Sequence, residues 1–218
     1  MLALIRISVP DRPGALGDVA SRIGAAGADI LQVQVLESEA GRALDDVHVR
    51  VRDADHLERV KQQLAAISGV QVVGVRDEPA PTTGHGELEL ARRMVAAPTR
   101  ALQTLVDGVS ASTGSDWAAI VRFDLNERVD QILATSPGCP GPEHVQIEVP
   151  LRLSVIGGTH AGMALVPLTG TRLGLVVVRE SGPPYHQAEL WRLEQVGALA
   201  GNVLRQNQPA SSELEVTA

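Results

Sequence analysis

The stretch Val9–Gly17, VPDRPGALG, carries residue types that could hold a small charged molecule. Gly14 stands where an apolar run gives way to a helical pattern, and a glycine there lets a ligand approach the backbone with no Cβ in the way. The first N–H groups of that helix, near residues 15–17, lack intrahelical partners and attract a carboxylate. Asp29, further along the chain, could receive an ammonium group. Together these groups suit the two charged ends of a free amino acid.

A plainer interpretation of the same residues is structural. Pro13 would simply start the helix, Gly14 would make the turn, and Asp29 would be a solvated residue where a strand begins. Under the binding interpretation, the side chain of the ligand would meet Leu16, Ile30 or a neighbouring copy of the chain. The two interpretations differ in whether a change at Asp29 alters the affinity for a ligand.

The elements that must position these residues follow from the apolar periodicity of residues 1–77. Four segments are apolar runs of strand length or alternate between apolar and polar residues. Two further stretches have apolar residues at helical spacing. Strands are expected at 2–9, 29–38, 46–52 and 69–75, and helices around 16–23 and 57–67, the second helix capped by Asp53 or Asp55. This order predicts a ferredoxin-like βαββαβ fold, with both helices on one face of a four-stranded antiparallel sheet.

Residues 1–77 also resemble the ACT domain, a family of amino-acid-binding regulatory modules. The motif is an apolar strand, Asp-Arg-Pro-Gly-x-Leu, a helix and Gly-x-Asp-Ile, represented here by Asp11, Arg12, Pro13, Gly14 and Leu16, then Gly27, Asp29 and Ile30. The resemblance implies a ligand-binding site made of Asp11, Arg12, Pro13, Gly14, Ala15, Leu16, Asp29 and Ile30. It also implies a homodimer, since ACT-like modules usually pair their sheets edge to edge.

A change of composition divides the chain into two domains. The stretch Arg76–Glu87, RDEPAPTTGHGE, is rich in proline, threonine and glycine, which is the composition of a connector. We therefore expect an ACT-like regulatory domain at 1–77, a linker at 78–86, a second domain at 87–207 and a flexible tail at 208–218.

The second domain is predicted to be α+β like the first. Helical patterns cover 87–97 and 99–114, strand patterns cover 117–124, 128–136 and two runs within 163–180, and a long helix follows. The proline- and glycine-rich middle, 137–162, has no secure assignment. This order resembles the GAF domain, a small-molecule sensor and dimerisation module, and implies a GAF-like antiparallel sheet with flanking helices. The signature of cyclic-nucleotide-binding GAF domains is missing, and the single lysine of the chain, Lys61, lies in the other domain.

Composition and charge exclude several classes of function. A net charge of −7 and an aromatic content of 2% provide neither a basic surface nor stacking platforms for nucleic acid. The chain shows no signal-peptide pattern and no apolar run of about 20 residues, so we expect a cytoplasmic protein without a membrane partner. The single cysteine, Cys139, falls in a stretch typical of an exposed loop, and the histidines are scattered singly. No metal, cofactor or catalytic residue is therefore predicted.

The sequence thus predicts a homodimeric, non-enzymatic regulatory protein that senses a small molecule. The ligand would be an amino acid bound at the first domain, and the GAF-like domain would pass the signal on. One alternative is a ligand-free dimerisation or scaffold protein for an enzyme or transcription factor. The other is a small enzyme with its site in the second domain, which would require Cys139, His144, Arg152 and His160 to gather around one pocket.

Overall fold

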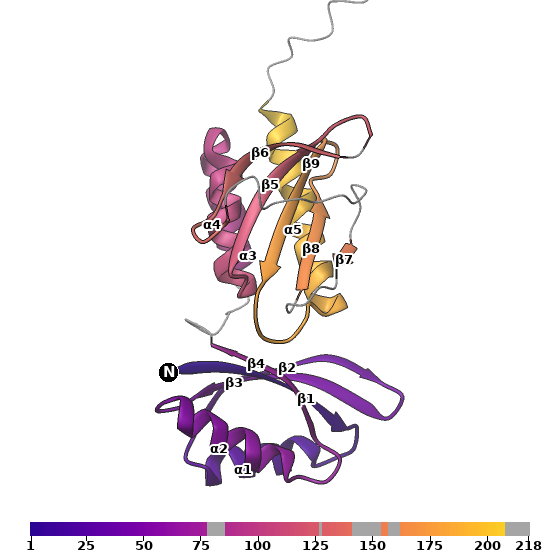
Figure 1. Ribbon diagram of the computed structural model, residues 1–218. Coiled ribbons are helices and arrows are strands. Elements are labelled where there is room, and N and C mark those ends of the chain that lie inside the picture. Colours follow the sequence, from indigo (N-terminus) through magenta and orange to yellow (C-terminus); the bar gives the residue numbers. More distant parts are fainter. Residues whose placement is uncertain (78–85, 127, 141–153, 157–161, 208–218) are drawn as a thin grey trace, which may run out of the picture. The chain divides into compact units, whose positions relative to one another are not determined.

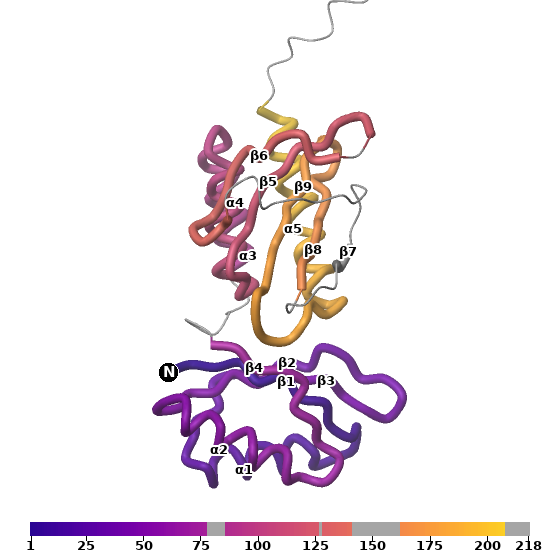
Figure 2. The backbone as a smooth tube through the Cα atoms, in the orientation of Figure 1, coloured from indigo at the N-terminus to yellow at the C-terminus, as the bar shows by residue number. Residues whose placement is uncertain are grey.

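The computed structural model describes residues 1–77, 86–126, 128–140, 154–156 and 162–207 (Figure 1). The chain divides into two compact units, Met1–Pro81 with Ser181–Ala188 and Thr82–Glu180 with Glu189–Ala218. Figure 2 follows the backbone through both units. The expected linker, apart from Gly86, and the expected tail lie outside the described residues, so the linker and tail assignments stay predictions.

The first unit has the expected ferredoxin-like fold. Its elements are β1 (Leu2–Pro10), α1 (Ala15–Ala25), β2 (Asp29–Glu39), β3 (Arg42–Arg50), α2 (Ala54–Ala65) and β4 (Gln71–Asp77). The strands form an antiparallel sheet in the order β2-β3-β1-β4, so β2 and β4 are its edges. Both helices cover the same face of this sheet (Figure 1).

The core of the first unit lies between that face and the helices. Ile5 and Ile7 from β1 and Val47 and Val49 from β3 are fully buried, because alternate residues of a strand point to one face. They pack with the apolar stripes of α1 and α2, which include Val19, Ile23, Val60 and Leu64. The alternation that identified the strands therefore also identifies the core.

Polar side chains fix two details of this unit. Asp53, rather than Asp55, caps α2, since its Oδ1 accepts a hydrogen bond of 2.7 Å from the backbone N–H of His56. Arg6 and Asp46 form a buried ion pair, with Nε donating to Oδ1 at 2.7 Å and Nη2 donating to Oδ2 at 2.8 Å. Arg6 and Asp46 adjoin core residues in sequence, so their side chains lie on the sheet face opposite the helices.

The second unit contains a five-stranded antiparallel sheet with flanking helices, as the GAF-like prediction requires. The helices are α3 (Gly86–Ala96), a 3₁₀ turn η1 (Pro98–Arg100), α4 (Ala101–Thr113) and α5 (Gln187–Gln206). The strands are β5 (Trp117–Phe123), β6 (Val129–Thr135), β7 (Ser154–Ile156), β8 (Gly162–Pro167) and β9 (Leu173–Arg179), in the order β6-β5-β9-β8-β7. Pro98 begins a fresh turn between α3 and α4.

The unassigned middle of the sequence contributes one described strand. Residues 154–156 pair with Met163–Leu165 of β8, which places β7 at the edge of the sheet. A buried ion pair fixes the start of α5, where Nη2 of Arg179 donates to Oε1 of Glu189 at 2.6 Å. Within the described part of the chain, no helix is long and apolar enough to span a bilayer.

Candidate functional site

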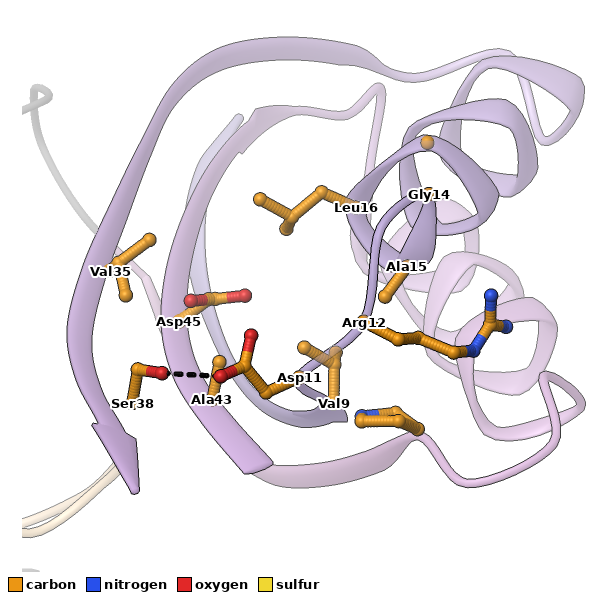
Figure 3. Close-up of a pocket in the computed structure, with 12 residues that line it drawn as sticks. Val9, Asp11, Arg12, Gly14, Ala15, Leu16, Val35, Ser38, Ala43 and Asp45 are labelled. Atoms are coloured by element: carbon orange, nitrogen blue, oxygen red, sulfur yellow. Dashed lines mark hydrogen bonds between the residues drawn. The ribbon is translucent and has the colours of Figure 1, made fainter. Parts of the chain in front are cut away.

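A cavity of about 220 Å³ lies in the first unit where β1 turns into α1 (Figure 3). Its wall consists of residues 9–12 and 14–17, which run from the end of β1 through the turn into α1, Val35 and Ser38 from β2, and Ala43 and Asp45 from β3. The cavity therefore lies over the rim of the sheet, on the face that the helices cover. Its volume suits a small molecule.

Gly14 gives the turn its shape. It precedes α1 as the N-cap residue, with a φ of 88° in the left-handed region and no side-chain cap. A Cβ placed on Gly14 would have no heavy atom within 4 Å. The position therefore requires glycine because of its backbone conformation, and not because a neighbouring group needs the space.

The beginning of α1 forms the positive side of the cavity. The backbone N–H of Ala15 donates to the carbonyl of Arg12 at 3.2 Å, and that of Asp18 donates to the carbonyl of Gly14 at 3.0 Å. The N–H groups of Leu16 and Gly17 lie between these two bonds, in the first turn, where a helix offers no acceptor. The first turn of α1 lines the cavity, so the helix dipole and the N–H groups of this turn favour an anion there.

The charged side chain of Arg12 does not add to this positive side. Its Nη2 lies 3.0 Å from Oδ2 of Asp18, and both side chains are about half exposed. Figure 3 shows the guanidinium directed away from Asp11 and Asp45. The backbone of the turn, rather than the arginine, therefore supplies the attraction for an anion.

Two carboxylates form the opposite side. Oγ of Ser38 donates to Oδ2 of Asp11 at 2.7 Å, shown as the dashed line in Figure 3. Asp45 is fully buried, and among the described residues neither of its carboxylate oxygens has a hydrogen-bond partner. Loss of solvent raises the pKa of Asp45 above its ordinary value, and the charges of Asp46 and Asp11 raise it further.

Asp45 was not predicted as a site residue, although the sequence contains a signal for it. Asp45 is in phase with Val47 and Val49, so it falls on the core-facing side of β3. A carboxylate at an apolar position of a strand is costly unless it has a partner. Its neighbours across the sheet are Ile7 on β1 and Val35 on β2, neither of which can donate a hydrogen bond.

The structure brings together five of the eight predicted site residues. Asp11, Arg12, Gly14, Ala15 and Leu16 line the cavity, and Pro13, in the same turn, is not among the lining residues.

Asp29 and Ile30 begin β2, whereas Val35 and Ser38 of the cavity wall lie near its other end. At the rise of an extended strand, Asp29 is about 20 Å from Val35. A single copy of the chain therefore does not bring Asp29 to the cavity. Its exposed carboxylate instead lies 3.9 Å from Nη1 of Arg50.

The alternative site in the second unit falls mostly outside the described residues. His144, Arg152 and His160 are not among them. Cys139, expected in an exposed loop, is instead partly buried and packs against the cluster that contains Trp117 and Phe123. This burial raises the pKa of its thiol, which disfavours the nucleophilic thiolate. The described residues contain no group of three or more His, Cys, Asp or Glu side chains that could hold a metal ion.

The strand order defines the first unit as a ferredoxin-like domain, and a cavity lies at its β1–α1 turn. Residues 2–74 match the family model described as the ACT domain. The N-terminal part of the chain thus matches the ACT domain family, and the second unit has the antiparallel sheet with flanking helices that the sequence predicted.

Solved structures show likenesses to both units. The GAF domain from Acinetobacter phosphoenolpyruvate-protein phosphotransferase is 18% identical, with 55% of this chain and 93% of that chain covered and a TM-score of 0.41. The ACT domain from GTP pyrophosphokinase of Chlorobium tepidum is 22% identical, with 35% of this chain and 95% of that chain covered and a TM-score of 0.30.

One curated relative is an enzyme. NAD-dependent malic enzyme 1 of Bacillus subtilis is 28% identical over 106 residues, which make up 48% of this chain. The match spans only 24% of that enzyme's length.

Proposed function

We propose that the protein is a non-enzymatic regulatory protein that binds a free amino acid at its ACT domain and passes the binding signal to the GAF-like domain. The observation that carries this proposal is the cavity at the β1–α1 turn. Its wall combines the first turn of α1 with the carboxylates of Asp11 and Asp45, and neither oxygen of Asp45 has a hydrogen-bond partner among the described residues. An α-amino acid has a carboxylate and an ammonium group on one carbon, so it complements both sides of a small cavity.

The carboxylate of the ligand would bind at α1. Its oxygens would accept hydrogen bonds from the N–H groups of Leu16 and Gly17, and the helix dipole would add to the attraction. The side chain of the ligand would lie against the apolar groups of the wall, among them Leu16 and Val35. This orientation uses the backbone for the charge common to all amino acids and side chains for selectivity.

The proposal includes a homodimer. β2 is an edge strand, and Val33 and Val35 on it are 41% and 53% exposed. An exposed edge with apolar side chains favours pairing with a second strand. Antiparallel pairing of two β2 strands would bring Asp29 of the partner subunit close to Ser38. The predicted contact of Asp29 with the ligand requires this arrangement.

A thermal-shift screen of the twenty amino acids on the full chain tests the proposal. A ligand at about a hundred times its dissociation constant should stabilise the ACT domain by about 2.7 kcal/mol. The amide of the best amino acid serves as the control, because it keeps the ammonium group but lacks the carboxylate for α1 and should therefore bind weakly. A screen in which no amino acid stabilises the protein would contradict the proposal and favour the ligand-free dimerisation function.

A further inference from the structure

We infer that Asp45, the buried carboxylate of β3, binds the ammonium group of the ligand within a single copy of the chain, with Asp11 beside it. The inference rests on the proposed function and deepens it. It assigns the recognition of the amine to a residue other than Asp29, and it defines the ligand as a small amino acid with an uncharged aliphatic side chain.

The first argument is the state of Asp45 itself. Its side chain is fully buried, and neither carboxylate oxygen has a hydrogen-bond partner among the described residues. An unpaired carboxylate inside a protein is strongly destabilising. It lines the cavity from the side of the sheet and points toward the space between the strands and α1 (Figure 3). A cation that enters this space would supply the missing partner.

The second argument is that the neighbouring cations are engaged elsewhere. Arg12 pairs with Asp18 at 3.0 Å, and Arg6 is in the buried pair with Asp46. Arg42, also on β3, donates from Nη2 to the carbonyls of Ser8 and Gly69, both at 3.0 Å. The other charged groups near Asp45 are Asp11 and Asp46, which are both acidic. No cation among the described residues is thus left to pair with Asp45, so a bound ligand would supply the complementary charge.

Asp29 fits this role less well than Asp45. Its side chain is 75% exposed and already lies near Arg50. An exposed pair in water contributes little, whereas a contact with a desolvated carboxylate is strong. The ammonium group of a ligand loses hydration when it binds, and a contact with the exposed Asp29 would offset little of that loss. Asp29 would thus add little affinity.

The remaining wall limits the side chain of the ligand. Val9, Ala15, Leu16, Val35 and Ala43 are apolar and surround a cavity of about 220 Å³. An acidic side chain would be repelled by the two carboxylates. A small aliphatic side chain fits both the volume and the apolar surface, so L-valine is a suitable probe.

Calorimetry with two probes tests the inference on the full chain. L-valine carries both charges, and 3-methylbutanoate has the same carbon skeleton and carboxylate but no amine. We expect the parent protein to bind L-valine about tenfold or more tightly than 3-methylbutanoate. Asp45→Asn should remove this preference and leave the affinity for 3-methylbutanoate nearly unchanged. Asp29→Asn, the matched control, should retain the preference.

Several outcomes separate this inference from the proposed function. If Asp45→Asn keeps the preference for L-valine, or if only Asp29→Asn loses it, the assignment of Asp45 is wrong while amino-acid binding stands. If the parent binds only amino acids with charged or bulky side chains, the assigned ligand class is wrong. If no amino acid binds the parent, both proposals fail. Asn has the shape of Asp without its charge, and circular dichroism will show that each variant is folded.

The pH dependence of L-valine binding gives a second readout. Binding an ammonium group requires Asp45 to be ionised, so the affinity of the parent should fall as the pH falls through the raised pKa of Asp45. Asp11, which also faces the cavity, remains in both proteins, and Asp46 is paired with Arg6. The Asp45→Asn variant should lack the part of this dependence that Asp45 causes. The same pH profile in the two proteins would overturn the inference.

Discussion

Asp45 carries a charge that no described side chain neutralises, and this affects the stability of the protein without a ligand. Because its pKa is raised on folding, the folded state holds the proton of Asp45 more tightly than the unfolded state does. The protonation of Asp45 therefore stabilises the folded state at pH values below the ordinary pKa of an aspartate. This stabilisation is lost as the pH rises through the raised pKa of Asp45.

Asp45→Asn should therefore stabilise the ligand-free ACT domain at pH 7 by about 1 kcal/mol, since an amide is less costly to bury than a carboxylate. The gain should shrink as the pH falls below the raised pKa, because the parent then carries a neutral side chain too. Amide hydrogen exchange of core residues such as Val47 and Val49 measures the opening free energy of this domain alone. A gain that is equal at pH 7 and at acidic pH would contradict the assigned cause.

At the residue scale, the sequence predicted the turn that lines the cavity, Asp11 included, and missed Asp45. The glycine and the helix start are local features, so the motif around Gly14 was sufficient to find them. Asp45 belongs to the site because of the pairing of β3 with β1 and β2, which depends on residues far apart in sequence. Asp29 was placed with the ligand by motif, but β2 carries it away from the cavity of its own chain.

At the scale of the element, the start of α1 depends on a glycine in the left-handed region. Gly14→Ala should destabilise the ACT domain by about 1 to 2 kcal/mol, because an L-residue is strained at a φ of 88° even where its Cβ has space. Gly24→Ala is the matched control within α1, where a Cβ also has space, and should stabilise by about 1 kcal/mol. Thermal unfolding of both variants provides the comparison. Equal effects of the two substitutions would show that the backbone conformation of Gly14 is not the cause.

Periodicity was a reliable guide to elements that bury a regular face. The helices of the ACT domain and its strands β1, β2 and β4 lie close to their predicted ranges, and the predicted long last helix is present as α5, since their apolar residues recur at the period of the element. Strand β3 begins at Arg42 rather than at the predicted residue 46, so Asp45 fell outside the predicted strand. β7 is only three residues long and is held by its pairing with β8. Such a strand has too few residues for a period, so it could not be predicted from local sequence.

At the scale of the whole molecule, the two edges of the ACT sheet offer a test of assembly. We expect a homodimer in light scattering at micromolar concentration, and Val33→Lys on β2 should weaken it, because a charged side chain on an edge strand opposes pairing. Val73→Lys on β4, the other edge, is the control, since Val73 is similarly exposed at 47%. A monomeric parent would contradict the dimer, and a monomer formed only by Val73→Lys would assign pairing to β4.

Asp45 and Asp46 are adjacent in the chain, yet they place one negative charge on each face of the same sheet. Arg6 balances the charge on the face away from the helices, and the field of Asp46 still reaches Asp45 through the backbone. The two faces of the sheet are therefore electrically coupled across a single peptide unit. A positive charge bound on the helix-covered face therefore changes the electrostatic potential at the Arg6–Asp46 pair on the other face. This effect needs no movement of the backbone, because the charges interact across the thickness of the sheet.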